Sequence, residues 1–206
     1  MKPKLLLCLA LVLSGNSYGA IVYPKAPDGG QQMVSKNLVP KFLGVSRIED
    51  LTIANPYENY YVGLTNLASG EFLSATKNNG YWTYPLMHGT NTVGEAGLSA
   101  DEKTGKALKF HSLQKSPFAD GTLKALRMAE QLPQIKKQDY EIRRFDIPWM
   151  LFVAVWLHGK SDDIIIPLPP TFGRWNAYQP YSESEIIKLL KPEAKKKLKQ
   201  PAGMVD

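Results

Sequence analysis

The chain has 206 residues, of which 44% are hydrophobic and 21% charged, so it is long enough to bury one substantial core. Its one cysteine, Cys8, excludes an intramolecular disulfide, a zinc–thiolate site and an iron–sulfur cluster. The net charge of +6 is concentrated in residues 188–199, which hold six lysines against one glutamate. The rest of the chain is close to neutral, so we expect no specific nucleic-acid partner.

The first nineteen residues have the composition of a secretory signal peptide. Two lysines precede the apolar run 5–13, and small or polar residues follow up to Gly19. The run is far shorter than the ~20 residues that cross a bilayer, and Cys8 lies inside it rather than after it, which argues against a lipid anchor. We therefore predict a signal peptide over 1–19 and an exported protein, periplasmic or secreted and most consistent with a bacterium. We expect no membrane span after cleavage.

The remaining chain divides by composition into three parts. Residues 20–40 are rich in proline, glycine and polar residues and predict an extended N-terminal arm. Residues 41–191 predict a single α+β globular domain with antiparallel-rich sheets, one core helix after the first strand group and a C-terminal helix. Residues 192–206 predict a lysine-rich tail.

The first strand group is expected to contain a β-hairpin. Asn79–Gly80 lies between two β-prone runs, 71–76 and 81–87, and this dipeptide favours the positive φ angles of a tight turn. The following residues, 88–106, carry several glycines and little periodicity, which predicts a long loop.

The core helix is predicted to follow that loop. Ser116 or Asp120 can cap it, and Pro133 stops it after Leu132. Leucine and alanine residues recur about one helical turn apart over 123–132 and form one apolar stripe.

The second strand group has the strongest pattern. Over 140–147 the apolar residues change parity across Arg143–Arg144, which predicts a β-bulge there. The unbroken apolar run 149–157 predicts a buried central strand, and 164–166 predicts another strand ended by prolines. Ser182 and Glu185 then form a capping box for the C-terminal helix, which Pro192 is expected to interrupt or restart.

Residues with catalytic chemistry are few and scattered. The three histidines, at 88, 111 and 158, have no metal-ligand spacing, and we expect no metal and no cofactor. No serine-hydrolase elbow or phosphate-binding loop is present. His88 and His158 each follow a strand-like run, so they can share one end of the sheet.

The most suggestive segment for binding is the irregular stretch 170–181. It carries four aromatic residues together with Arg174, a composition suited to stacking on a sugar or clamping a peptide. The alternative is a loop that packs its own aromatics over the core. We take Arg174, Trp175 and His158 as the candidate ligand-binding residues.

These observations favour a non-enzymatic binding or envelope-associated domain, with an envelope protein, a peptide or a glycan as its partner. The alternatives are a cell-wall or carbohydrate hydrolase with a histidine and a carboxylate at the sheet end, and a chiefly structural envelope protein. The C-terminal lysines add the possibility of weak contact with an anionic surface.

Overall fold

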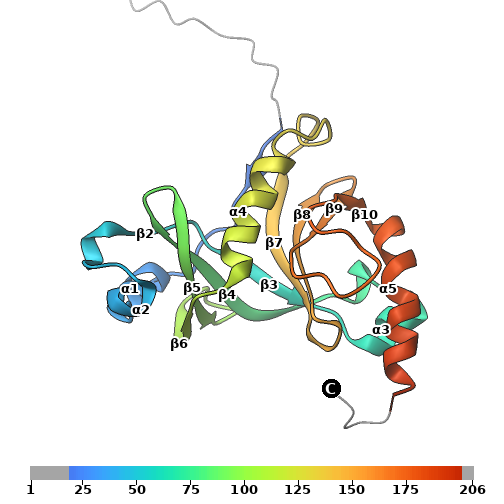
Figure 1. The fold of residues 1–206 in the computed structure, drawn as a ribbon, viewed down its shortest axis with the longest axis horizontal. Helices are drawn as coiled ribbons and strands as arrows, with labels where there is room; N and C mark the ends of the chain where they lie inside the picture. Colours follow the sequence, from blue (N-terminus) through green and yellow to red (C-terminus); the bar gives the residue numbers. More distant parts are fainter. Residues whose placement is uncertain (1–18, 201–206) are drawn as a thin grey trace, which may run out of the picture.

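The computed structural model describes residues 19–200, and the predicted signal peptide therefore lies outside it except for Gly19. Within this range the chain has an α+β fold built on one mixed, mainly antiparallel sheet (Figure 1). The strands are β1 (Ile21–Val22), β2 (Leu51–Ile53), β3 (Tyr57–Tyr61), β4 (Lys77–His88), β5 (Asn91–Ala100), β6 (Ala107–Gln114), β7 (Tyr140–Ile147), β8 (Phe152–Gly159), β9 (Asp163–Pro167) and β10 (Tyr181–Ser182).

The strands follow the order β10-β9-β8-β7-β3-β4-β5-β6, while β1 pairs with β7 and β2 with β4. Only the pairings of β1 and β3 with β7 are parallel. The helices are α1 (Gly30–Lys36), α2 (Pro40–Leu43), α3 (Leu64–Ser69), α4 (Pro117–Ala129) and α5 (Glu183–Leu198), with short 3-10 turns η1 (Ile48–Asp50), η2 (Leu73–Ala75) and η3 (Pro148–Met150).

Strand β7 is buried on both faces, and this explains the change of parity in its sequence. Tyr140 and Ile142 belong to a cluster beneath α4, whereas Phe145 and Ile147 belong to a cluster on the opposite face with α3 and α5. The register with β8 runs unbroken from Tyr140 to Ile147, so the predicted β-bulge at Arg143–Arg144 is wrong. The buried residues change face because the strand passes from one core to another.

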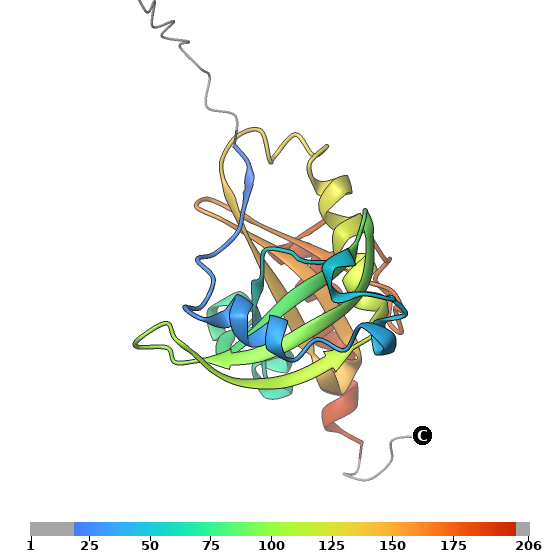
Figure 2. The ribbon, with the colours of Figure 1, turned by 90° about the vertical axis from the view of Figure 1, so that its left-hand side faces the viewer.

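A third cluster lies under the β4–β6 half of the sheet. Helices α1 and α2 lie across these strands and contribute Val34 and Leu43 to the cluster (Figure 2). Residues 30–36 of the predicted extended arm are therefore helical, because Val34 has an apolar surface to cover.

The hairpin predicted at Asn79–Gly80 is wrong, although the conformational signal there is real. Gly80 has φ 68°, but it lies inside the continuous strand β4, where the register with β3 shifts. The positive φ thus serves a bulge rather than a turn. The hairpin loop comes at Gly89–Thr90, with Gly89 at φ 60°.

The long loop predicted over 88–106 is also wrong, because residues 91–100 form β5, which pairs with both β4 and β6. Two of the glycines that suggested a loop, Gly94 and Gly97, lie in β5 where neighbouring atoms approach closely. A Cβ on Gly97 would collide with the Tyr81 hydroxyl group, whose ring covers that position.

Helix α4 confirms the predicted core helix, although it ends at Ala129 rather than at Leu132. The Ser116 hydroxyl accepts a hydrogen bond from the Phe118 amide at 3.1 Å, and Ala125, Leu126 and Ala129 are buried. The helix contacts both β5 and β8, so it lies between the two halves of the sheet (Figure 1).

Helix α5 confirms the predicted C-terminal helix and its Ser182–Glu185 capping box. It continues past Pro192 to Leu198, so residues 192–198 are helical rather than a tail. Ala194 is fully buried beside Leu190, and this packing favours continuation of the helix across the proline.

The apolar run 149–157 is not one strand. Residues 148–150 form η3, Leu151 adopts φ 50°, and β8 begins only at Phe152. β8 lies between β7 and β9 and is largely buried, as expected, but Trp149 and Leu151 are left on the surface.

The beginning of the described chain adds to the edge of β7. Ile21 pairs with Tyr140 in parallel, and the Ala20 amide donates a hydrogen bond to Asp139 Oδ1 at 2.9 Å. None of the helices in residues 19–200 is both long and apolar enough to cross a membrane.

The aromatic core beneath α5 should dominate stability. Phe145 is fully buried and lies edge-on to Phe72, Phe152 and Trp156, at centroid distances of 5.0, 6.2 and 6.3 Å. Phe145→Ala should lower the free energy of unfolding by about 3–5 kcal/mol, measured by urea denaturation. Leu108→Ala, at a side chain 60% exposed, is the control and should change it by less than about 0.5 kcal/mol. Equal losses in the two variants would contradict this core.

Candidate functional site

A large apolar concavity opens at the end of the β7–β8 hairpin, on the sheet face that carries α4. We call it the aromatic groove. Its volume is about 830 Å³, within the usual range of ligand-binding clefts. Its lining comes from β3, β7, β8, the start of α4 and the loop after β9: Tyr60, Tyr61, Val62, Gly63, Asn79, Phe118, Arg144, Asp146, Pro148, Trp149, Leu151, Phe152, Val153, Pro170 and Phe172.

The rim of the groove concentrates exposed apolar side chains. Trp149 is 70% exposed, Leu151 62% and Phe172 66%, and Tyr61 is also exposed. Single exposed apolar residues are normal on protein surfaces, but a contiguous group around one concavity is typical of an interaction site.

Local backbone geometry holds two of these side chains outward. Pro148 begins η3, and the Leu151 amide donates a hydrogen bond to the Pro148 carbonyl at 3.0 Å. Leu151 is one of two non-glycine residues of the described chain with positive φ, an unfavourable conformation for leucine. The turn therefore presents Trp149 and Leu151 to solvent although both are apolar.

The floor of the groove is charged and largely buried. Arg144 Nη1 lies 3.0 Å from Glu95 Oε2, and Arg144 Nε lies 3.3 Å from Asp146 Oδ1. The Arg144 and Glu95 side chains are 11% and 2% exposed, whereas Asp146 is 24% exposed and faces the groove. The guanidinium also lies over the Phe118 ring, 5.3 Å from its centroid.

Burial and charge act in opposite directions on these groups. Burial raises the pKa of Asp146, and the nearby Arg144 offsets only part of this effect. Burial alone would lower the pKa of Arg144, but the charges of Asp146 and Glu95 outweigh it and raise that pKa. With one cation and two carboxylates, the ionised cluster has one negative charge in excess.

The predicted ligand-binding residues Arg174 and Trp175 do not line this groove. Trp175 is 4% exposed and lies edge-on to Phe152 in the core, which corresponds to the alternative of a loop that covers the core with its own aromatics. Arg174 is exposed, with its Nε 3.7 Å from Glu193 Oε1. The same loop nevertheless contributes Phe172 to the groove.

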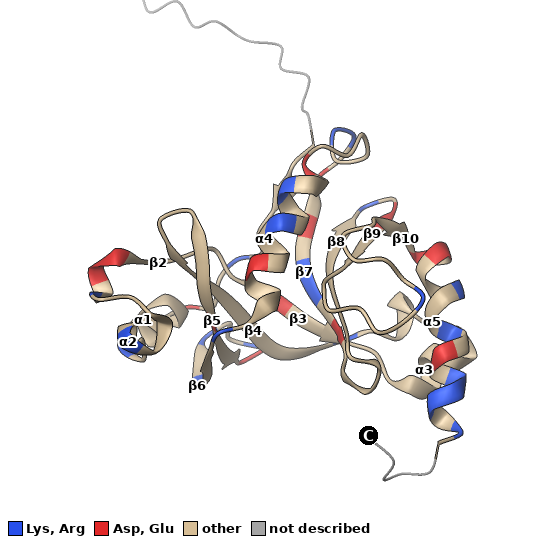
Figure 3. Cartoon of the chain, viewed as in Figure 1, with Lys and Arg blue, Asp and Glu red and all other residues tan. Residues whose placement is uncertain are grey.

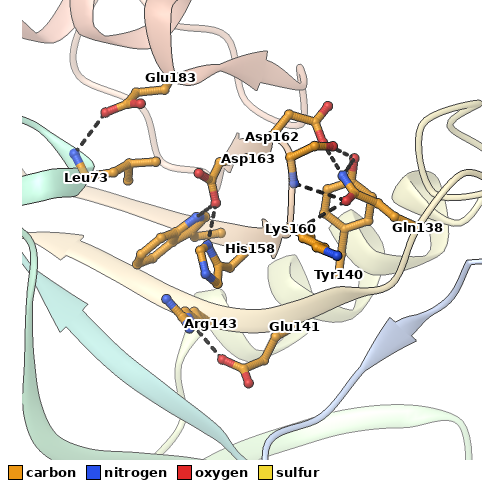
Figure 4. A network of polar contacts seen from close by, with 12 residues as sticks. Leu73, Gln138, Tyr140, Glu141, Arg143, His158, Lys160, Asp162, Asp163 and Glu183 are labelled. Carbon is orange, nitrogen blue, oxygen red and sulfur yellow. Dashed lines mark hydrogen bonds and ion pairs between the residues drawn. The ribbon is translucent and has the colours of Figure 1, made fainter.

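His158, the third predicted residue, lies on β8 beside β9 (Figure 4). Its Nδ1 is 2.7 Å from Asp163 Oδ1, which also accepts a hydrogen bond from the Trp156 indole at 2.7 Å. In residues 19–200 neither a nucleophilic hydroxyl nor a second acid hydrogen-bonds to His158. A histidine–carboxylate pair is thus present at the sheet end, and a hydrolase site built on it stays a prediction.

The neighbouring contacts of this region hold the β8–β9 turn in place. Tyr140 donates a hydrogen bond to Asp162 Oδ1 at 2.6 Å, and Gln138 contacts the same oxygen (Figure 4). The side-chain oxygen Oε1 of Gln138 accepts hydrogen bonds from the backbone amides of Lys160 and Ser161. These hydrogen bonds pair the polar groups of the β8–β9 turn with one another and leave few of them for a ligand.

The three histidines are not brought together. His88 pairs with Asn91 at the end of β4, His111 contacts Ser99 from β6, and His158 lies on β8, which is separated from β4 by β7 and β3. Across the described range no group of three histidine, cysteine or acidic side chains is arranged to hold a metal ion.

A second hollow, of about 650 Å³, lies between the start of the chain and the β5–β6 turn, and it is lined by mixed charges. Two of the four carboxylates that line it have internal hydrogen-bond partners. Asp101 accepts from the amides of Lys103 and Thr104, and Glu58 accepts from Tyr60 and Asn78. The aromatic groove, with exposed apolar walls and a partly exposed acid, is the better candidate.

Comparison with known proteins gives no relative from which to transfer a function. No family model matches the chain, and no curated protein or solved structure shows significant similarity to it.

The ion pair beneath the groove should be essential for stability. Arg144→Met leaves the Glu95 carboxylate buried without a cation and should lower the free energy of unfolding by about 3–5 kcal/mol in urea. Adding Glu95→Leu removes that stranded charge and should restore most of the loss. Arg47→Met, at an exposed pair with Asp50, should have little effect. An Arg144→Met protein as stable as Arg47→Met would contradict the burial of this pair.

Asp146 should make stability depend on pH. Because its pKa is raised in the folded state, its favourable contribution is complete below the ordinary value of 3.8 and is lost as pH rises through the higher folded pKa. Unfolding free energies of the wild type minus those of Asp146→Asn should therefore fall as the pH rises above the ordinary pKa of the carboxyl group and through its raised pKa in the folded state. A difference that is constant or rises over this range would contradict the raised pKa.

Proposed function

We propose that this protein is an exported, non-enzymatic binding domain whose aromatic groove holds an extended apolar segment of a partner protein. The observation that supports it most directly is the ring of exposed apolar side chains around the partly exposed carboxylate of Asp146. Apolar walls supply affinity, and one polar group fixes the orientation of the bound segment.

The walls favour a peptide over a glycan. A sugar presents hydroxyl groups around its ring, so a glycan site needs many polar partners, whereas most of the groove surface comes from proline, aliphatic and aromatic side chains. Leu151, Phe152, Val153 and Pro170 offer no hydrogen-bonding side chain. Apolar peptide side chains match this lining better.

The floor favours a basic residue in the bound segment. The positive charge of Arg144 is already offset by the carboxylates of Glu95 and Asp146, so a further acidic group would add to an excess of negative charge. Within residues 19–200 no hydrogen bond reaches Asp146 Oδ2, and the cluster has an excess negative charge. A lysine or arginine side chain would neutralise this excess and lie among aromatic rings that favour a cation.

Peptide-display selection on the purified protein tests this proposal. Selected sequences should combine apolar or aromatic residues with a lysine or arginine, and Trp149→Ala should abolish their binding in fluorescence anisotropy. If the selected peptides lack this enrichment, or if Trp149→Ala does not change their affinity, the binding site lies elsewhere. If the protein binds an oligosaccharide array in preference to the peptides, a glycan ligand would be favoured instead.

The role of Asp146 is tested with a matched peptide pair. Asp146→Asn should weaken binding of the selected lysine peptide about tenfold and leave a version with norleucine for lysine unchanged. Glu102→Gln, an exposed acid outside the groove, is the control and should change neither affinity. Equal losses for both peptides in Asp146→Asn would show that the carboxylate does not recognise the cation.

A further inference from the structure

The end of the β7–β8 hairpin projects apolar side chains that residues 19–200 leave exposed. Trp149 and Leu151 come from the turn between the strands, and Phe172 comes from the loop after β9. All three also border a small hollow of about 150 Å³ together with Glu193 and Lys197 of α5. The apolar tip therefore lies directly beside the C-terminal end of that helix.

That end of α5 is strongly basic (Figure 3). Lys195, Lys196, Lys197 and Lys199 are exposed, and no carboxylate of the described residues lies within ion-pair distance of them. Leu198, among these lysines, is 48% exposed and adds a further apolar side chain. The buried stripe of α5 at Ile186, Leu190 and Ala194 holds the helix against the core, so Lys197 stands at a fixed place beside the tip and the other lysines lie within two residues of it along the chain.

We infer that this combined surface docks on an anionic lipid bilayer, with Trp149, Leu151 and Phe172 in the headgroup region and the four lysines against lipid phosphates. An indole ring suits the boundary between headgroups and acyl chains. Lysines near an anionic surface each add attraction, and exposed apolar side chains add burial, so the two groups together bind more strongly than either would alone.

A bilayer fits this surface better than a soluble polyanion. A polyanion would satisfy the lysines but leave three large apolar side chains in water, whereas a membrane interface accommodates both kinds of group at once. The inference goes beyond the peptide-binding role, because it places the mouth of the groove next to a membrane surface.

The lysines are tested with vesicles of phosphatidylcholine and phosphatidylglycerol in a ratio of about seven to three, in a flotation assay. Reversing Lys195, Lys196, Lys197 and Lys199 to glutamate should weaken vesicle partitioning at least about tenfold. The matched control reverses four exposed lysines remote from the tip, so that both proteins have the same net charge: Lys36, Lys41, Lys103 and Lys109. It should weaken partitioning less than about threefold, because charges beyond a Debye length of about 8 Å are screened.

The apolar tip is tested by tryptophan fluorescence. Of the four tryptophans only Trp149 is exposed, since Trp82, Trp156 and Trp175 are 6%, 4% and 4% exposed. Brominated lipids should quench the fluorescence of the wild type, and Trp149→Phe should remove most of this quenching while the protein still floats. Leu151→Asp should weaken partitioning.

Several outcomes would overturn the inference. These are equal losses in the two lysine variants, no quenching by brominated lipid, and equal binding to vesicles of phosphatidylcholine alone. If the protein binds vesicles without quenching of its tryptophan fluorescence, and dextran sulfate displaces it from them completely, the lysines would bind a soluble polyanion instead. Asp146→Asn separates the two proposals, because it should weaken binding of the lysine peptide and leave vesicle binding unchanged.

Discussion

The contact between Arg144 and Glu95 constrains the shape of the whole sheet. The two residues lie on β7 and β5, which are separated by β3 and β4, and strands spaced by about 4.8 Å would hold them too far apart if the sheet were flat. Their side chains meet because the sheet folds around α4, as the contacts of this helix with both β5 and β8 show. The aromatic groove opens beside this fold, and its charged floor is part of the same contact.

Much of the fold could be predicted where one local signal acts alone. The Ser116 cap and the Ser182–Glu185 capping box mark the beginnings of α4 and α5, and both helices are present. The failures come from signals that serve more than one structure. The positive φ of Gly80 suits a bulge as well as a turn, and the glycines of β5 reflect close contacts whose partners are distant in the sequence.

The site was harder to predict because its residues come from separate elements. The aromatic loop 170–181 is predicted to bind a ligand, and that stays a prediction. Which of its rings are buried depends on contacts with β8 and α5, and Trp175 rather than Phe172 is part of the core. Arg144 and Asp146 carried a usable signal, since they are charged residues of opposite sign at positions of the same parity in a strand whose apolar residues are all buried. That pattern predicts a buried ion pair, but it does not identify Glu95 as the partner.

The hydrogen bond from the Ala20 amide to Asp139 has a consequence for maturation. Hydrolysis of the bond after Gly19 would turn this amide into an α-ammonium group, so the freshly exposed amino terminus would form an ion pair with Asp139 at the edge of β7. Processing would thereby fasten the first residues onto the sheet instead of releasing them. This ion pair would be revealed by a pKa of the α-amino group above its ordinary range in the processed protein and within that range in Asp139→Asn.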